Sequence, residues 1–131
     1  MSTDTTINTE ERQAIEQAIQ TYFDGLYEGD ADKLASVFHD TSALTWEQDG
    51  QLAVWTLAEW LKAVRERPSP KAKGLARDDA ILWLDQSGPN TAFVKVRCQL
   101  PPRYFTDYLV AMKLSDGWKI VSKSYRYDLR G

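Results

Sequence analysis

The stretch that decides the fold of this chain is residues 105–125, which read FTDYLVAMKLSDGWKIVSKSY. Two apolar-rich runs flank Ser115-Asp116-Gly117, and an Asp-Gly pair between such runs predicts a β-hairpin. If these residues form a three-residue turn, Asp107 lies opposite Tyr125, and Lys123 is its diagonal neighbour on the same face. A turn of another length would move Lys123 to the other face, because side chains alternate along a strand.

Around this hairpin the sequence predicts three helices and further strands. Asn8 is the expected cap of a first helix that ends at Gly29, and Asp30 is the expected cap of a second. Thr56-Leu57-Ala58-Glu59 is a capping box for a third helix, which ends before Pro68. The expected strands cover residues 43–47, 51–55, 80–85, 91–100, 104–114 and 118–127. Helices gathered before antiparallel strands indicate an α+β fold.

Size and composition favour one compact domain. The chain has 131 residues, of which 43% are apolar, and we expect a disordered tail over residues 1–8 and a single domain over residues 9–131. No run of 18 apolar residues occurs, and the N-terminus lacks the features of a secretory signal. The single cysteine, Cys98, excludes an intramolecular disulfide. These features predict a cytoplasmic protein that does not enter a membrane.

Charge is distributed unevenly along the chain. The net charge of -3 argues against nucleic-acid binding. Residues 62–77 nevertheless carry six basic residues against Glu66 alone: Lys62, Arg65, Arg67, Lys71, Lys73 and Arg77. Such a run either solvates the end of a helix and a loop or forms an anion-binding loop.

The hairpin also carries a family resemblance. Asp-Tyr-Leu (107–109), Asp-Gly-Trp-Lys-Ile-Val (116–121) and Lys123 resemble the last two strands of NTF2-like domains. They are most similar to the branch named "putative lumazine-binding", with its SnoaL-like members. Phe38-His39-Asp40 matches a family motif that commonly has a proline after the histidine, which is absent here. The resemblance implies a cone, in which three helices in the N-terminal half pack on a strongly bent, mostly antiparallel sheet with an open end for a ligand.

Polar candidates for a site are few. Without a glycine-rich phosphate loop, and with one histidine and one cysteine far apart, the chain offers no nucleotide or zinc motif, and we expect neither a metal nor a cofactor. Asp107 and Lys123 form either a structural ion pair or a charged pocket wall, in which the lysine binds an oxygen and the aspartate acts as a base. His39 either contacts the carbonyls at a helix end or exchanges a proton with a ligand.

Aromatic residues and one arginine complete the candidate pocket. Trp46, Trp55 and Trp83 are candidates for the pocket lining, although a tryptophan at such a position is more often core, and Tyr104 can add a phenol donor. Arg97 either faces an anionic ligand or lies exposed, or in a salt bridge at a dimer interface.

Three functions follow from this reading. The first is a small-molecule-binding domain, for which a planar heteroaromatic compound is one candidate ligand. The second is a cofactor-free acid-base enzyme similar to ketosteroid isomerases, polyketide cyclases and dehydratases. Two departures count against the enzyme. Thr45-Trp46-Glu47 stands where the isomerases have a catalytic aspartate, and the dehydratases use two histidines, whereas this chain has only His39. The third is an interaction module that forms a homodimer through the sheet face.

Overall fold

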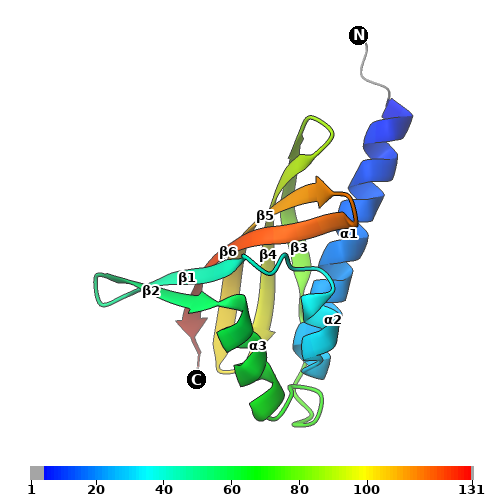
Figure 1. The fold of residues 1–131 in the computed structure, drawn as a ribbon. Helices are drawn as coiled ribbons and strands as arrows, with labels where there is room; N and C mark the ends of the chain where they lie inside the picture. The colour runs from blue at the N-terminus through cyan, green and yellow to red at the C-terminus, as the bar shows by residue number, and fades with distance from the viewer. Residues whose placement is uncertain (1–4, 131) are drawn as a thin grey trace.

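The computed structural model describes residues 5–130 (Figure 1). The described elements follow one another as α1 (Thr5–Glu28), α2 (Ala31–Ala35), β1 (Ala43–Gln48), β2 (Gln51–Thr56), α3 (Leu57–Glu66), β3 (Ala80–Ser87), β4 (Thr91–Leu100), β5 (Arg103–Leu114) and β6 (Gly117–Leu129). The predicted α+β class is confirmed.

Short polar side chains begin the two shorter helices, as predicted. The Asp30 carboxylate accepts a hydrogen bond from Lys33 N at the start of α2. Thr56 and Glu59 form both bonds of the capping box that opens α3. Helix α1 starts at Thr5, three residues before the expected cap, so the prediction that Asn8 caps it is wrong.

The helix extends upstream of Asn8 because neither glycine nor proline interrupts residues 5–8. The predicted tail over residues 1–8 thus overlaps α1 from Thr5 onward. Residues 1–4 lie outside the part of the chain that the structure describes. The division into a tail and a domain over residues 9–131 stays a prediction.

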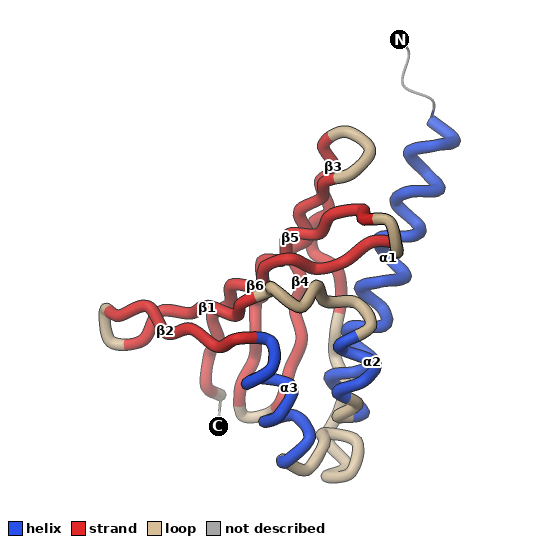
Figure 2. The backbone as a smooth tube through the Cα atoms, viewed as in Figure 1, coloured by secondary structure: helices blue, strands red, loops and turns tan. Residues whose placement is uncertain are grey.

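The strands form a six-stranded sheet in the order β2-β1-β6-β5-β4-β3. Neighbouring strands are antiparallel except for β1 and β6, which pair in parallel through Leu44 with Lys123 and Thr45 with Ser124. Figure 2 shows the strong bend of the sheet, since β3 and β4 run steeply in this view whereas β1 and β2 project sideways. The predicted NTF2-like cone is confirmed.

The β5–β6 hairpin reaches the predicted register by an unexpected route. Its turn has two residues rather than three, because Leu114 pairs with Gly117. A β-bulge then leaves Val121 unpaired and shifts the register by one residue. Beyond the bulge, Asp107 pairs with Tyr125 as the three-residue turn predicted.

The bulge follows a point where the segment after α2 docks on β6. Ile120 N donates to Val37 O at 2.7 Å, and Ile120 O accepts from His39 N at 2.9 Å and from Ser42 Oγ at 2.8 Å. Because the bulge reverses the alternation of side chains, Ile120 and Lys123 both face the inside of the cone, where they are 1% and 6% exposed.

The core lies between the helices and the inner face of the sheet. Its most buried members are Ile15, Ile19, Tyr22, Leu34, Leu44, Val64, Val94, Val96, Leu109 and Ile120. The opposite, outer face of the sheet exposes Leu52, Val54, Trp83, Tyr108 and Met112. The inner face of the sheet therefore packs against the helices, whereas the outer face leaves apolar side chains exposed.

Candidate functional site

A cavity of about 470 Å³ remains between the inner face of the sheet and the helices. The described aromatic side chains that line it are Phe23, Tyr27, Trp46, Trp55, Trp60, Phe105, Tyr125 and Tyr127. Trp46 stacks on Tyr125 with ring centroids 5.3 Å apart, and Trp55 meets Trp46 edge-on at 5.9 Å. This size and this ring-rich lining are typical of small-molecule sites.

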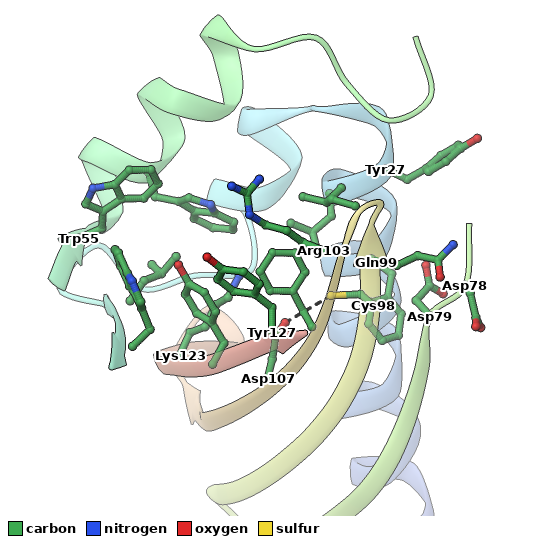
Figure 3. Close-up of a pocket in the computed structure, with 18 of the residues that line it drawn as sticks. Tyr27, Trp55, Asp78, Asp79, Cys98, Gln99, Arg103, Asp107, Lys123 and Tyr127 are labelled. Carbon is green, nitrogen blue, oxygen red and sulfur yellow. Dashed lines mark hydrogen bonds between the residues drawn. The ribbon is translucent and has the colours of Figure 1, made fainter. Parts of the chain in front are cut away.

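Asp107 lies on the inner wall of the cavity and is 1% exposed. Its Oδ2 atom accepts a hydrogen bond from the Tyr22 hydroxyl at 2.5 Å and one from the Cys98 thiol at 3.5 Å, and Figure 3 marks the latter with a dashed line. The other oxygen, Oδ1, is buried and has no hydrogen-bond partner among residues 5–130. Buried polar atoms are nearly always paired, so an unpaired one marks a candidate functional group.

Lys123 also lines the cavity, held among aromatic rings rather than by an acid. Its Nζ lies 4.4 Å from the ring centroid of Trp60, 5.1 Å from that of Tyr22 and 5.4 Å from that of Tyr125. In the described part of the chain this nitrogen makes no hydrogen bond and lies within 4.0 Å of no carboxylate oxygen. Burial lowers the pKa of the ammonium below 10.5, and the attraction of Asp107 offsets this only in part.

The hydroxyl and thiol groups near Asp107 hold their protons tightly. Burial first, and then the charge of Asp107, raise the pKa of Tyr22 well above 10.0 and that of Cys98 well above 9.0. The same two causes raise the pKa of Tyr125 to about 12. Tyr22 and Cys98 therefore act as hydrogen-bond donors to the carboxylate near neutral pH.

Two arginines stand at the opening of the cavity. Arg67 follows the last turn of α3 and Arg103 begins β5, and both are exposed residues that also line the cavity. The Arg103 guanidinium lies over the Tyr127 ring, 5.4 Å from its centroid. Figure 3 shows Asp78 and Asp79 across the pocket from Trp55.

Four of the predicted site residues line the cavity, namely Asp107, Lys123, Trp46 and Trp55. They come from β1, β2, β5 and β6, which meet only because the sheet brings the N-terminal hairpin beside the last strand. Their roles as base, oxygen ligand and aromatic wall stay predictions.

The other four lie elsewhere: His39, Trp83, Tyr104 and Arg97 are not among the residues that line the cavity. His39 Nδ1 lies 2.7 Å from Thr41 Oγ1, beyond the end of α2. Trp83 is 63% exposed on the outer face. Arg97 pairs with Asp78 at 3.3 Å, and Tyr104 lies beneath the Arg130 guanidinium at 4.5 Å.

Sequence reasoning missed several residues of the site. In the sequence, Tyr22 and Trp60 are indistinguishable from the other apolar-stripe residues of their helices, and Cys98 from a small core residue of a strand. Arg67 gave a usable signal, because it belongs to the basic run over residues 62–77. Tyr125 gave one through its predicted pairing with Asp107.

Solved structures share this fold. An NTF2-like protein of unknown function from Silicibacter pomeroyi superposes with a TM-score of 0.81 at 21% identity, covering 92% of this chain and 98% of that one. One from Shewanella baltica gives 0.82 at 19% identity, over 93% and 97%. A ketosteroid isomerase-like protein from Erwinia carotovora atroseptica gives 0.70 at 16% identity, over 92% and 98%. These likenesses establish the fold.

Sequence comparisons give the family. Among curated proteins, none matches the chain significantly. Over the described residues, no helix combines the length and apolarity needed to cross a bilayer. Residues 10–126 match the family described as "Putative lumazine-binding". The chain, which has the NTF2-like fold, therefore belongs to the "Putative lumazine-binding" family.

Proposed function

We propose that this domain binds a planar heteroaromatic small molecule in its cone. The observation that carries the proposal is the ring-lined cavity of about 470 Å³ with the Lys123 ammonium in its wall and no acid or acceptor bound to that ammonium within residues 5–130. Stacked and edge-on rings such as Trp46, Trp55 and Tyr125 favour a flat ligand. The family description agrees with this ligand class.

Lys123 is the polar group that orients the ligand. A buried donor gains most from an acceptor that replaces lost water, and a ring carbonyl or ring nitrogen of a flat heterocycle supplies one. Asp107 is a buried carboxylate whose charge favours the protonated amine and so partly offsets the lowering of the Lys123 pKa by burial.

Tryptophan fluorescence tests the proposal directly. Lumazine, lumichrome and riboflavin are titrated into the protein, and binding is expected to quench emission from Trp46, Trp55 and Trp60, which line the cavity. Trp83→Phe is the matched control, because Trp83 is exposed on the outer face and its loss leaves the ligand-induced quenching intact.

Lys123→Met is expected to weaken binding at least about tenfold, because it removes the hydrogen bond that the charged amine donates to the ligand. Folding of each variant is checked by circular dichroism. The proposal fails if no compound changes the emission or the melting temperature of the wild type.

A second function, cofactor-free acid-base catalysis, is favoured by the unpaired Oδ1 atom of Asp107. A buried carboxylate in the wall of a cavity can act as a general base toward a bound carbon acid. The test is isomerisation of a β,γ-unsaturated ketone by wild type and Asp107→Asn. Equal rates for the two proteins, or no rate above buffer, would exclude it.

We also propose a homodimer through the outer face of the sheet. Trp83, Tyr108 and Met112 expose 63%, 41% and 38% of their surface there, and apolar exposure on one sheet face marks an interaction surface. Sedimentation of wild type and Tyr108→Lys tests this, with a monomeric wild type as the contrary result. The cytoplasmic location and the absence of a metal or cofactor stay predictions.

A further inference from the structure

The charged residues that line the cavity do not balance one another. Arg77 pairs with Asp24 at 2.6 Å and with Asp79 at 2.8 Å, and Asp78 pairs with Arg97 at 3.3 Å. The remaining lining charges are three cations, Arg67, Arg103 and Lys123, against the single carboxylate of Asp107.

The two arginines at the opening have no acidic partner. Within residues 5–130, neither side chain makes a hydrogen bond or an ion pair, and the Arg103 guanidinium lies over the face of the Tyr127 ring. Partial burial and the like charge of Arg103 lower the pKa of the Arg67 guanidinium, whereas Tyr125 acts in the opposite direction. Because Arg67 and Arg103 line the same cavity, their like charges repel each other there, and an anion between them relieves this repulsion.

We propose that Arg67 and Arg103 form an oxyanion site at the opening, so that the ligand is a flat heterocycle bearing a phosphate or a carboxylate. This inference rests on the proposed function and adds the charge of the ligand. The ring system enters the aromatic cavity toward Lys123, and the anionic group stays at the entrance. Guanidinium groups suit this task because they present fixed pairs of donors to phosphate and carboxylate oxygens.

The position of the site explains the basic run over residues 62–77 in part. Arg67 leaves the end of α3 toward the cavity, whereas Arg65 pairs with Asp32 at 3.2 Å in solvent. The run thus contains both a solvated arginine and a site arginine, only two residues apart. This gives a matched control on the same helix end.

Pairs of compounds that differ only in the anionic group test the proposal. Riboflavin is compared with flavin mononucleotide for phosphate, and lumazine with 6-carboxylumazine for carboxylate, by calorimetry and fluorescence. The anionic member of at least one pair is expected to bind at least about tenfold more tightly to wild type. Inorganic phosphate alone, as a competitor, shows whether the site binds the anion without the ring.

The variants Arg67→Gln, Arg103→Gln and their double variant are expected to lose this preference while retaining the neutral member of each pair. Arg65→Gln keeps it. Raising the NaCl concentration tenfold shortens the screening length about threefold and should reduce the preference in wild type and in Arg65→Gln, whereas the double variant has no preference left to lose.

Failure has two distinct forms. If neutral compounds bind but wild type shows no preference for the anionic member, or the double variant keeps the preference, the oxyanion site is refuted and the proposed function stands. If no compound of either pair binds wild type, the proposed function fails, and the oxyanion site fails with it.

Discussion

Replacing Lys123 by methionine is expected to leave the stability of the protein almost unchanged. A conventional buried ion pair would behave differently, since removing one partner costs about 3–5 kcal/mol. Here Lys123 Nζ lies within 4.0 Å of no carboxylate among the described residues. The Asp107 carboxylate is held instead by Tyr22 and Cys98, and these bonds survive the substitution.

The magnitude follows from opposing contributions. The lowered pKa of Lys123 means that burial disfavours the ammonium more than Asp107 favours it, so removing the charge relieves a penalty. The ring contacts with Trp60, Tyr22 and Tyr125 are lost, at about 0.5–2 kcal/mol in total. Methionine recovers part of this through packing and sulfur–aromatic contacts worth about 0.3–1.5 kcal/mol. We expect a net change within about 1 kcal/mol.

Urea unfolding followed by circular dichroism measures this change, with Tyr22→Phe as the contrasting variant. Tyr22→Phe removes a buried hydrogen bond to a charged acceptor and should cost about 1.5–3 kcal/mol. A loss of about 3 kcal/mol or more in Lys123→Met would refute the reasoning and show that Lys123 and Asp107 form a structural ion pair in solution.

The pH dependence of the same variant provides an independent check. Because the pKa of Lys123 is lower in the folded state than the ordinary 10.5, the folded state binds fewer protons between these two values. The stability of the wild type should therefore rise relative to Lys123→Met as pH increases through that window. A difference that stays constant up to pH 10.5 would contradict the assigned burial of the charge.

Three further predictions concern other parts of the chain. Because the pKa of Cys98 is raised, the native thiol should react slowly with Ellman's reagent near pH 8, and faster in Asp107→Asn. Equal reaction rates in the wild type and in Asp107→Asn would contradict this. Because the pKa of Tyr125 is raised to about 12, the wild type should lose stability between pH 10 and 12. Tyr125→Phe should lose less stability over this range when unfolding is followed at alkaline pH, and the difference is small because half-burial leaves the charge partly screened by solvent. Thr56→Ala should cost about 1 kcal/mol in urea unfolding by removing the α3 cap, and an unchanged midpoint would count against the capping box.

Local chemistry determined most of the secondary structure. Thr56 and Glu59 form the capping box that begins α3, and the Asp30 side chain caps α2 with a single hydrogen bond. Hydrophobic alternation placed the strands to within a few residues, because one face of each must be buried. The prediction that the sheet bends into a cone came from the resemblance of the hairpin to NTF2-like domains.

Register was harder, because it depends on contacts distant in sequence. With the two-residue turn alone, Lys123 would lie opposite Tyr108 on the outer face. Val121 bulges beside Ile120, on which residues 37–42 dock across more than 75 positions of sequence, and this bulge turns Lys123 inward. The predicted pairing of Asp107 with Tyr125 is nevertheless correct. The prediction placed the extra residue of β6 in a three-residue turn, whereas the structure places it in the bulge, and both shift the register by one.

The amino-acid sequence by itself determined the helices, the strands and the family, since caps, turns and periodicity act over a few neighbouring residues. Only the tertiary structure decided which candidates share a cavity. Trp55 and Trp83 are indistinguishable in a strand pattern, yet one lines the cone and the other is 63% exposed, because the bent sheet has an inner and an outer face. Arg67 and Arg103 lie 36 positions apart, and the fold alone brings their charges to one opening.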